Sequence, residues 1–383
     1  MIAVFLLGVA AVLLLYGFYY QKRWFRALSV EVRFSRPHVY AKGTLELTEV
    51  IENRKKLSLP VIEIGFRVPR GLHFTDVENT LESDYLYKRD LFAVAGMERI
   101  VRRYPVTALK RGFYSVSQLT CQSPSRLFGM TYIMDQPSQK EDSGLYVYPA
   151  FVDCSLLLRA VEVILGERES ARKIYEDPFV FSSIRPYTIR DPMKTVNWKA
   201  TAKCGFLMVN TYASTASVKV RIFLDVSADP GIPFSDSLRE LGIAMAASLI
   251  RSLLKGQRDA SLVVNCAASA PGRPISFPSC LGSGKMTSLE EFLTTDFDRV
   301  PLLGFEEMIR QESEMRTRVP ASGNDDEIFV FLTCADRPSL VRAIHTLLGK
   351  DRSAVLALLC RTADRKHEAQ EGNLHILPVC DVG

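Results

Sequence analysis

The sequence lacks any group of cysteines or histidines that is spaced like a set of metal ligands. Its eight cysteines include no C-x-x-C pair, and its five histidines are widely dispersed. A structural zinc site and a disulfide framework both depend on patterned cysteines, so neither is expected. Cys266, Cys334 and Cys360 lie inside apolar runs, where a thiol packs as a small hydrophobic group. This cysteine usage favours a reducing compartment.

Common catalytic motifs are missing as well. The sequence has no G-x-S-x-G segment, which marks the nucleophile of many hydrolases. The glycine-rich segment 282–285 lacks the first glycine of a nucleotide-binding loop, and we expect a turn there. The acidic pair Glu306-Glu307 falls in helix-like sequence, where carboxylates are usually solvated. The sequence therefore predicts a protein that is not an enzyme.

Long runs of basic charge are also missing. The net charge is +5 over 383 residues, and basic clusters such as Arg99-Arg102-Arg103 and Lys110-Arg111 are short and lie in strand-like sequence. Proteins that bind nucleic acids usually show a concentrated basic face with interleaved aromatic residues. Nucleic acid is therefore not an expected partner.

A long apolar run stands at the N-terminus. Residues 2–20 carry no charged side chain, and about twenty apolar residues in a helix span the hydrocarbon core of a bilayer. Lys22, Arg23 and Trp24 follow directly, as positive charge and an interfacial aromatic residue would at a membrane surface. We expect residues 1–21 to be a single-pass membrane anchor with the soluble domains on the cytoplasmic side. A secretory signal is the alternative, although the run has no positive region before it and no small-residue cleavage site after it.

Between residues 28 and 150 the sequence has the pattern of successive strands. Residues that favour strands alternate or cluster between turn signals such as Lys110-Arg111-Gly112. Helical periodicity is scarce, so crossover helices are not expected and the strands should pair antiparallel. The pattern predicts an antiparallel β-sandwich over residues 28–150. The expected strands are 29–35, 43–53, 60–68, 98–106, 112–121 and 145–149.

From residue 219 onward strands alternate with helices. Residues 220–228 form a continuous apolar run of the kind that is buried on both faces in a parallel sheet, and residues 237–255 have apolar residues at helical spacing. We expect a doubly wound α/β domain over residues 219–383, with helices on both faces of the sheet. Further strands are expected at 261–268, 274–280, 327–334, 354–360 and 374–379, and further helices at 288–292, 305–315 and 339–348.

Two polar loops follow strands of this expected sheet. The first reads D-V-S-A-D over residues 225–229, and the second reads T-C-A-D over residues 333–336. Ligands of open parallel sheets bind beyond the carboxyl ends of the strands. Carboxylate and hydroxyl oxygens at that edge suit a hard cation such as Mg²⁺, although the same side chains are also typical of helix and turn caps. The expected metal ligands are Asp225, Ser227, Asp229 and Asp336.

A polar and charged stretch from Arg185 to Val209 precedes the first α/β strand. It lies within residues 151–218, which we expect to link the two domains. An ordinary connection is only a few residues long, whereas this one holds one of the two tryptophans of the chain and charges of both signs. Such a segment suits the docking of a partner or an internal latch that ties the two domains together. The remaining alternative is a helix packed on the α/β domain, with Trp198 in the core and its charges solvated. The candidate binding residues are Arg185, Tyr187, Asp191, Asn197, Trp198, Lys199 and Lys203.

The same stretch resembles the signature of a bacterial membrane-anchored family called domain of unknown function 58. That family typically shows R-x-Y-x-x-G-D-x-x-R-x-I-x-W, then a small residue, a base, glycine and an apolar strand. Here Arg190 replaces the glycine before the aspartate, while Lys194 and Val196 replace the arginine and the isoleucine. The residues that match are Arg185, Tyr187, Asp191, Trp198, Lys203 and Gly205.

The resemblance covers nearly the whole chain. Segments 110–114 and 127–129 look like the sandwich domain of that family, and the α/β region resembles a von Willebrand factor A domain. Asp225 and Ser227 match the first loop, Asp-x-Ser-x-Ser, of the metal-ion-dependent adhesion site in such domains, whereas Asp229 stands in place of the second serine. Relatives often have a pair of membrane spans, and this chain shows one.

The resemblance implies a membrane-anchored scaffold or adaptor rather than an enzyme. Its implied partner is a MoxR-type AAA+ ATPase, and its implied task is the assembly or maturation of other proteins. The alternative is a metal-ion-dependent receptor that binds a protein partner through the degenerate adhesion-site loop, with Mg²⁺ as the cofactor.

Overall fold

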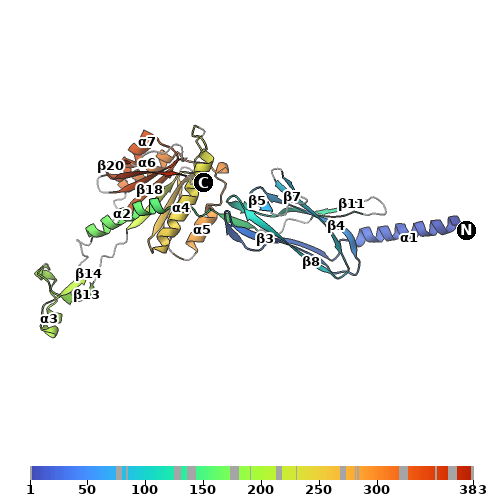
Figure 1. Ribbon diagram of the computed structural model, residues 1–383, viewed down its shortest axis with the longest axis horizontal. Coiled ribbons are helices and arrows are strands. Elements are labelled where there is room, and N and C mark those ends of the chain that lie inside the picture. Colours follow the sequence, from blue (N-terminus) through green and yellow to red (C-terminus); the bar gives the residue numbers. More distant parts are fainter. Residues whose placement is uncertain are drawn as a thin grey trace. The chain divides into compact units, whose positions relative to one another are not determined.

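The computed structural model divides the chain into two compact units (Figure 1). One comprises residues 1–150 with 290–295, and the other comprises residues 151–289 and 296–383. The residues that the structure describes are 2–74, 80–82, 85–124, 131–135, 144–172, 181–189, 191–212, 218–229, 231–267, 273–280, 282, 284–318, 327–349, 352–360 and 369–380.

The first unit begins with an apolar helix, α1 (Ile2–Arg23). Among the described residues it is the one helix long and apolar enough to cross a membrane, and its described side chains are mostly exposed. The chain thus has one N-terminal apolar helix, which is either a membrane anchor or a signal sequence. Trp24, expected at a lipid interface, is instead only 4% exposed and belongs to the core of the sandwich, because the chain turns directly after α1.

The rest of the first unit is the predicted antiparallel β-sandwich, apart from one parallel pair, β2 with β12. Its sheets have the strand orders β1-β3-β8-β5, β11-β10-β4-β7-β6 and β2-β12-β9. The strands are β1 (Leu28–Phe34), β2 (His38–Tyr40), β3 (Thr44–Asn53), β4 (Leu59–Pro69), β5 (Leu72–Phe74), β6 (Thr80–Glu82), β7 (Tyr85–Val94), β8 (Arg99–Ala108), β9 (Gly112–Tyr114), β10 (Ser117–Pro124), β11 (Thr131–Asp135) and β12 (Leu145–Tyr148).

Alternating apolar residues form the sandwich core. In β1 every second residue from Leu28 to Val32 is buried and the residues between them are exposed, which is the period of a strand with one face in a core. The single strand expected at 112–121 is two strands, because β9 pairs with β12 while β10 pairs with β4 and β11.

The second unit is built on a seven-stranded, mostly parallel sheet in the order β17-β16-β15-β18-β19-β21-β20. The inner strands pair in parallel, and the two edge strands β17 and β20 pair antiparallel with their neighbours. This confirms the α/β domain that the sequence predicts, with a sheet that is mixed because its two edge strands are antiparallel. The strands are β15 (Lys219–Leu224), β16 (Ala260–Ala267), β17 (Pro274–Phe277), β18 (Glu327–Thr333), β19 (Ala354–Cys360), β20 (Ala369–Glu371) and β21 (Leu374–Cys380).

Helices pack against this sheet because its inner strands are apolar throughout. Phe223, Phe329 and Phe331 form one core with residues of α6 and α7. The intervening residues of the strands meet α4, where Gly242 lies close to Leu224. Figure 1 shows α2 beside α4, and α6 beside α7. The helices are α4 (Ser235–Lys255), α5 (Lys285–Phe292), α6 (Phe305–Arg318), α7 (Pro338–Leu348) and the short η3 (Phe297–Arg299).

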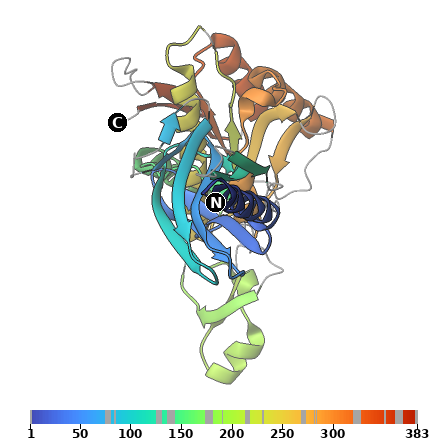
Figure 2. The ribbon, with the colours of Figure 1, turned by 90° about the vertical axis from the view of Figure 1, so that its right-hand side faces the viewer.

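Residues 151–218 contain structured elements of two kinds. The helix α2 (Ser155–Arg172) packs against α4, β18 and β19 of the sheet. The other elements form a small hairpin, seen in light green in Figure 2. They are β13 (Phe181–Pro186), η2 (Met193–Thr195), α3 (Trp198–Cys204) and β14 (Met208–Tyr212).

Candidate functional site

The strand order of the seven-stranded sheet reverses between β15 and β18. The chain runs outward from β15 through β16 to β17, and then returns to place β18 on the other side of β15. Ligands of open α/β sheets bind beyond the carboxyl ends of the strands at such a reversal. Asp225 follows β15 directly, and Thr333 is the last residue of β18, so both lie there.

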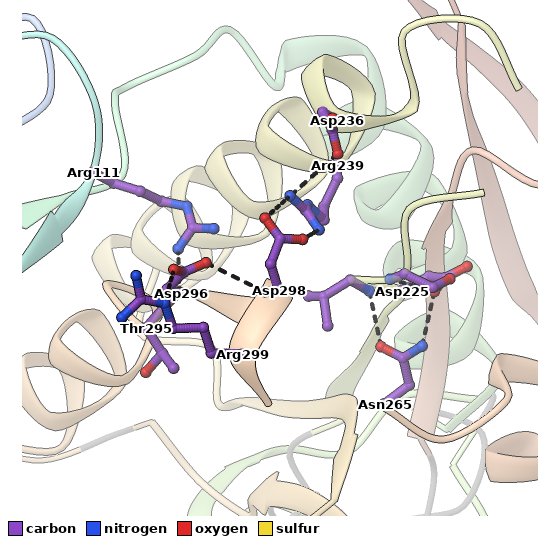
Figure 3. A network of polar contacts seen from close by, with 11 residues as sticks. Arg111, Asp225, Asp236, Arg239, Asn265, Thr295, Asp296, Asp298 and Arg299 are labelled. Carbon is purple, nitrogen blue, oxygen red and sulfur yellow. Dashed lines mark hydrogen bonds and ion pairs between the residues drawn. The ribbon is translucent and has the colours of Figure 1, made fainter. Parts of the chain in front are cut away.

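A hydrogen-bond network holds the carboxylate of Asp225. Its Oδ1 accepts from the hydroxyl of Ser227 at 2.5 Å and from the amide of Asn265 at 2.8 Å, and its Oδ2 accepts from the hydroxyl of Thr333 at 2.8 Å. Asn265 also accepts from the backbone N–H of Val226 at 2.8 Å. Figure 3 shows Asn265 beside Asp225, with their hydrogen bond as a dashed line. Asp225 is only 5% exposed, and both oxygens of its carboxylate are therefore satisfied from within the domain.

A cavity of about 460 Å³ opens beside this network. Asp225, Ser227 and Asp229 contribute to its lining from the first loop, and Cys334 contributes from the end of β18. Burial, the largest cause, together with the charge of Asp225 raises the pKa of the Cys334 thiol to about 11. A thiol needs to ionise before it attacks a substrate, so this cysteine is a poor nucleophile at neutral pH.

Charged pairs line the rest of the cavity. Asp229 accepts from the N–H of Gly231 and pairs with Arg337, and these two contacts lower the pKa of the Asp229 carboxyl. Glu307 pairs with Arg310 at 3.1 Å on α6. The lining therefore mixes acidic and basic groups that already have partners in the chain.

The four predicted metal ligands are only partly brought together. Asp225, Ser227 and Asp229 line the cavity, whereas Asp336 is exposed and is not among the lining residues. The described residues contain no group of three or more His, Cys, Asp or Glu side chains placed to hold a metal ion. Because Asp229 is already paired with the guanidinium of Arg337, the residues present do not fit a Mg²⁺ site.

The signature segment forms the hairpin. β13 pairs antiparallel with β14, with Arg185 opposite Val209 and Pro186 opposite Met208. The N–H of Tyr187 extends the pairing by donating to the carbonyl of Leu207. The segment is therefore an ordered element with its own sheet.

A two-pronged ion pair fixes the turn of the hairpin. The guanidinium of Arg185 donates to both oxygens of Asp191 at 2.7 and 2.6 Å, and the backbone N–H and hydroxyl of Thr188 donate to the same carboxylate at 2.8 Å each. The Arg185 contact is the largest cause that holds the pKa of Asp191 well below its usual range. Arg185 and Asp191 thus bind one another, which leaves this carboxylate little capacity for a ligand.

The short helix α3 is capped at both ends. The side chain of Asn197 accepts from the N–H of Ala200 at 2.9 Å, and its amide donates to Asn210 at 2.7 Å, which ties the start of α3 to β14. At the other end Gly205 adopts φ 76°, a left-handed conformation that glycine tolerates best, and its N–H donates to Thr201. Asn197 therefore has a structural role.

The remaining candidate residues of the segment face solvent. Trp198 is 65% exposed, and Lys199 and Lys203 are exposed on the same helix. The exposure of Trp198 contradicts the alternative in which α3 packs on the α/β domain with this side chain in its core. Phe206 and Leu207, which follow the helix, are exposed too.

Sequence reasoning did not identify Asn265 or Arg337 as members of the site. Asn265 is fully buried in β16 and donates a hydrogen bond to Asp225. The sequence feature that could have identified it is a single amide side chain in a mostly apolar strand. Buried polar groups need partners, so such a residue marks a nearby polar network. Arg337 had no comparable signal, because its pairing with Asp229 depends on the tertiary fold.

No protein-family model and no curated protein matches the chain. Solved structures match it over about a third of its length. A CARDB domain from Pyrococcus furiosus, in complex with di-metal ions, is 14% identical over 32% of this chain and 92% of that domain, with a TM-score of 0.19. A cohesin module of a Clostridium perfringens family 33 glycoside hydrolase is 11% identical over 32% of this chain and 96% of the module, with a TM-score of 0.20. These are distant likenesses to β-sandwich domains, and they indicate no function.

Proposed function

We propose that this chain is a non-enzymatic, membrane-anchored scaffold or adaptor that works with a MoxR-type AAA+ ATPase in the assembly or maturation of other proteins. The partner comes from the resemblance of residues 185–209 to the signature of domain of unknown function 58. The anchor is α1, whose length and apolar surface suit a membrane span. Lys22 and Arg23 at its end favour a cytoplasmic location for both folded units.

The non-enzymatic part of the proposal rests on the hydrogen bonds that hold the carboxylate of Asp225. This residue occupies the position where α/β domains usually place their chemistry. Its carboxylate accepts from Ser227, Asn265 and Thr333, so it is committed to holding the loops together. The nearby Cys334 thiol has a raised pKa. The top of the sheet is therefore better suited to binding than to proton transfer or nucleophilic attack.

Co-purification tests the proposal directly. The full-length tagged chain is isolated from detergent-solubilised membranes and its partners are identified by mass spectrometry. We expect a MoxR-type ATPase in every repeat, and none with a control that carries only residues 1–23 fused to the tag. Repeated isolation of the chain without any AAA+ ATPase would falsify the proposal.

The membrane anchor and its orientation need a separate test. If α1 is an anchor, the chain isolated from membranes keeps its first residues, and a signal sequence would be missing from the mature protein. We expect intact mass measurements to include α1. Protease added outside intact cells should leave both folded units uncut, whereas digestion of either unit would contradict the cytoplasmic placement.

A further inference from the structure

The signature hairpin presents an exposed surface that combines apolar and basic side chains. Trp198, Lys199, Ala202 and Lys203 stand at positions i, i+1, i+4 and i+5 of α3 and so share one side of the helix, where all are exposed. Phe206 and Leu207 continue the exposed apolar character directly after the helix. We call these six residues the Trp198 surface.

Basic side chains outnumber acidic ones in this hairpin. Residues 181–212 include five basic side chains, and the acidic side chain among them is Asp191. Asp191 is bound by Arg185 and Thr188, so it does not neutralise the lysines of α3. Among the residues that the structure describes, Lys199 and Lys203 take part in no ion pair.

The arrangement of the lysines works against the stability of α3. Lys199 and Lys203 are four residues apart, and like charges at this spacing destabilise a helix slightly. Lys199 also stands in the first turn, where the helix dipole disfavours positive charge, whereas Lys203 stands in the last turn, where the dipole favours it. A seven-residue helix has little stability of its own to lose. Lys199, and the placing of two lysines at this spacing, are therefore better explained by the binding of an external acidic surface than by folding.

The scaffold beneath the surface is rigidly hydrogen-bonded. Asn197 caps α3 and joins it to Asn210. The hydroxyl of Thr201 accepts a hydrogen bond from the backbone N–H of Met208 at 3.0 Å. A protein interface gains affinity when its contact residues are held in place before binding. A fluid lipid headgroup layer adapts to its ligand and does not need such preorganisation. The geometry therefore favours a protein partner.

We infer that the Trp198 surface docks an acidic protein surface with an apolar recess for the indole, on the ATPase named under Proposed function. This inference rests on that function for the identity of the partner. Buried tryptophans are frequent energetic centres of protein interfaces. Lys199 and Lys203 steer the acidic partner, so the association is sensitive to salt.

Affinity measurements with the full-length chain in detergent and a purified MoxR-type ATPase test the inference. We expect Trp198→Ala to weaken binding by at least about tenfold, in line with interface tryptophans elsewhere. The double variant K199E/K203E should weaken it as well and should flatten its salt dependence. The matched controls are Leu91→Ala, an exposed apolar residue of the sandwich, and K42E/K56E, which changes the net charge by the same amount. Both controls should bind like the parent.

Fluorescence supplies a second readout, because the chain has two tryptophans and Trp24 is buried. The difference in emission between the parent and Trp198→Phe reports Trp198 alone. We expect this signal to move to shorter wavelength when the ATPase is added. In nanodiscs that contain brominated phosphatidylglycerol we expect no quenching of it.

The outcomes separate the two proposals. If the parent does not bind the ATPase, the proposed function and the inference both fall. If the parent binds and the Trp198 and lysine variants bind equally well, the inference is overturned while the proposed function stands. Quenching of Trp198 by the brominated lipid would overturn the inference in favour of a membrane surface.

Discussion

The side chains of Glu49 and Tyr104 lie 2.9 Å apart in the interior of the sandwich. The hydroxyl of Tyr104 is also 2.8 Å from Asp90, and one hydroxyl proton cannot serve both carboxyl groups. Glu49 is fully buried, and one of its oxygens has no partner among the described residues. A protonated Glu49 resolves the conflict, because it donates to Tyr104 and leaves the proton of Tyr104 for Asp90. Burial, the largest cause, raises the pKa of Glu49 to about 7.

This arrangement predicts that the first unit loses stability as the pH rises from 4.5 to about 7. Over that range the unfolded chain releases the proton of Glu49 while the folded chain retains it, so folding is favoured most below the window. At 1.36 kcal/mol per unit of pKa the upper limit is about 3 kcal/mol. Glu49→Gln stays neutral and should remove this pH dependence. The measurement is denaturant unfolding across the window.

Glu46→Gln is the control for this prediction, since Glu46 is exposed on the same strand. It should keep the pH dependence of the parent. If the free energy of unfolding of Glu49→Gln fell with pH as steeply as that of the parent, Glu49 would be ionised in the folded protein.

The Asp225 network predicts a large cost for Asn265→Ala. The substitution removes one donor from a buried carboxylate and leaves the N–H of Val226 without its acceptor. Together these losses should destabilise the second unit by about 3 kcal/mol. Scanning calorimetry should show its transition lowered by roughly 6–12 °C. Cys266→Ala, at the next buried position of β16, should cost clearly less. If the two substitutions lowered the transition temperature equally, Asn265 would contribute only through the packing of its side chain and not through its hydrogen bonds.

The pairing of Asp229 with Arg337 predicts that Mg²⁺ does not stabilise the second unit. A ligand present at one hundred times its dissociation constant would add about 2.7 kcal/mol to the stability of the folded state. We expect no such shift with Mg²⁺ or Mn²⁺ in calorimetry of the full-length chain. A shift in the parent that Asp225→Asn abolished would contradict this prediction and would support the alternative of a metal-dependent receptor.

The sequence predicted the α/β sheet more fully than the sandwich. Strands such as β18 and β19 are continuous apolar runs bounded by polar loops, so their burial is visible in the sequence alone. The strand β7 was not predicted, because it buries Lys88 and Asp90, and these charges conceal the alternation that marks a strand. Lys88 lies against the ring of Tyr104 and near Asp90, contacts that only the folded sheet creates.

The candidate sites show the same limit. The loop positions of Asp225 and Ser227 followed from the strand pattern. The sequence does not show that the carboxylate of Asp225 is held by hydrogen bonds, because one of the donors is Asn265, which is far from it in sequence. The signature segment was identified by its residues, but the exposure of Trp198 was not, because a large aromatic residue is compatible with either a core or an interface.

The ion pair of Arg185 and Asp191 leads to the last prediction, that Asp191→Asn loosens the hairpin and weakens binding of the ATPase although the Trp198 surface is unchanged. An uncharged asparagine cannot form the two charge-assisted bonds to the guanidinium. Because contacts to the charged form hold the pKa of Asp191 well below its usual range, the lock is present above the pKa of an unfolded aspartate and is lost only as the pH falls through the lowered value. Mild acid should therefore not reproduce the variant.

Hydrogen exchange at the amide of Thr188, which donates to Asp191, measures the loosening. Exchange should become faster in Asp191→Asn while the unfolding transitions of the two units stay in place, since the ion pair lies within the hairpin. Arg185→Lys keeps the charge but not the two-pronged geometry, so its exchange rate should be intermediate. If Asp191→Asn exchanged like the parent and still bound the ATPase weakly, Asp191 would act by touching the partner. Fast exchange together with normal binding would instead show that docking does not depend on a rigid hairpin.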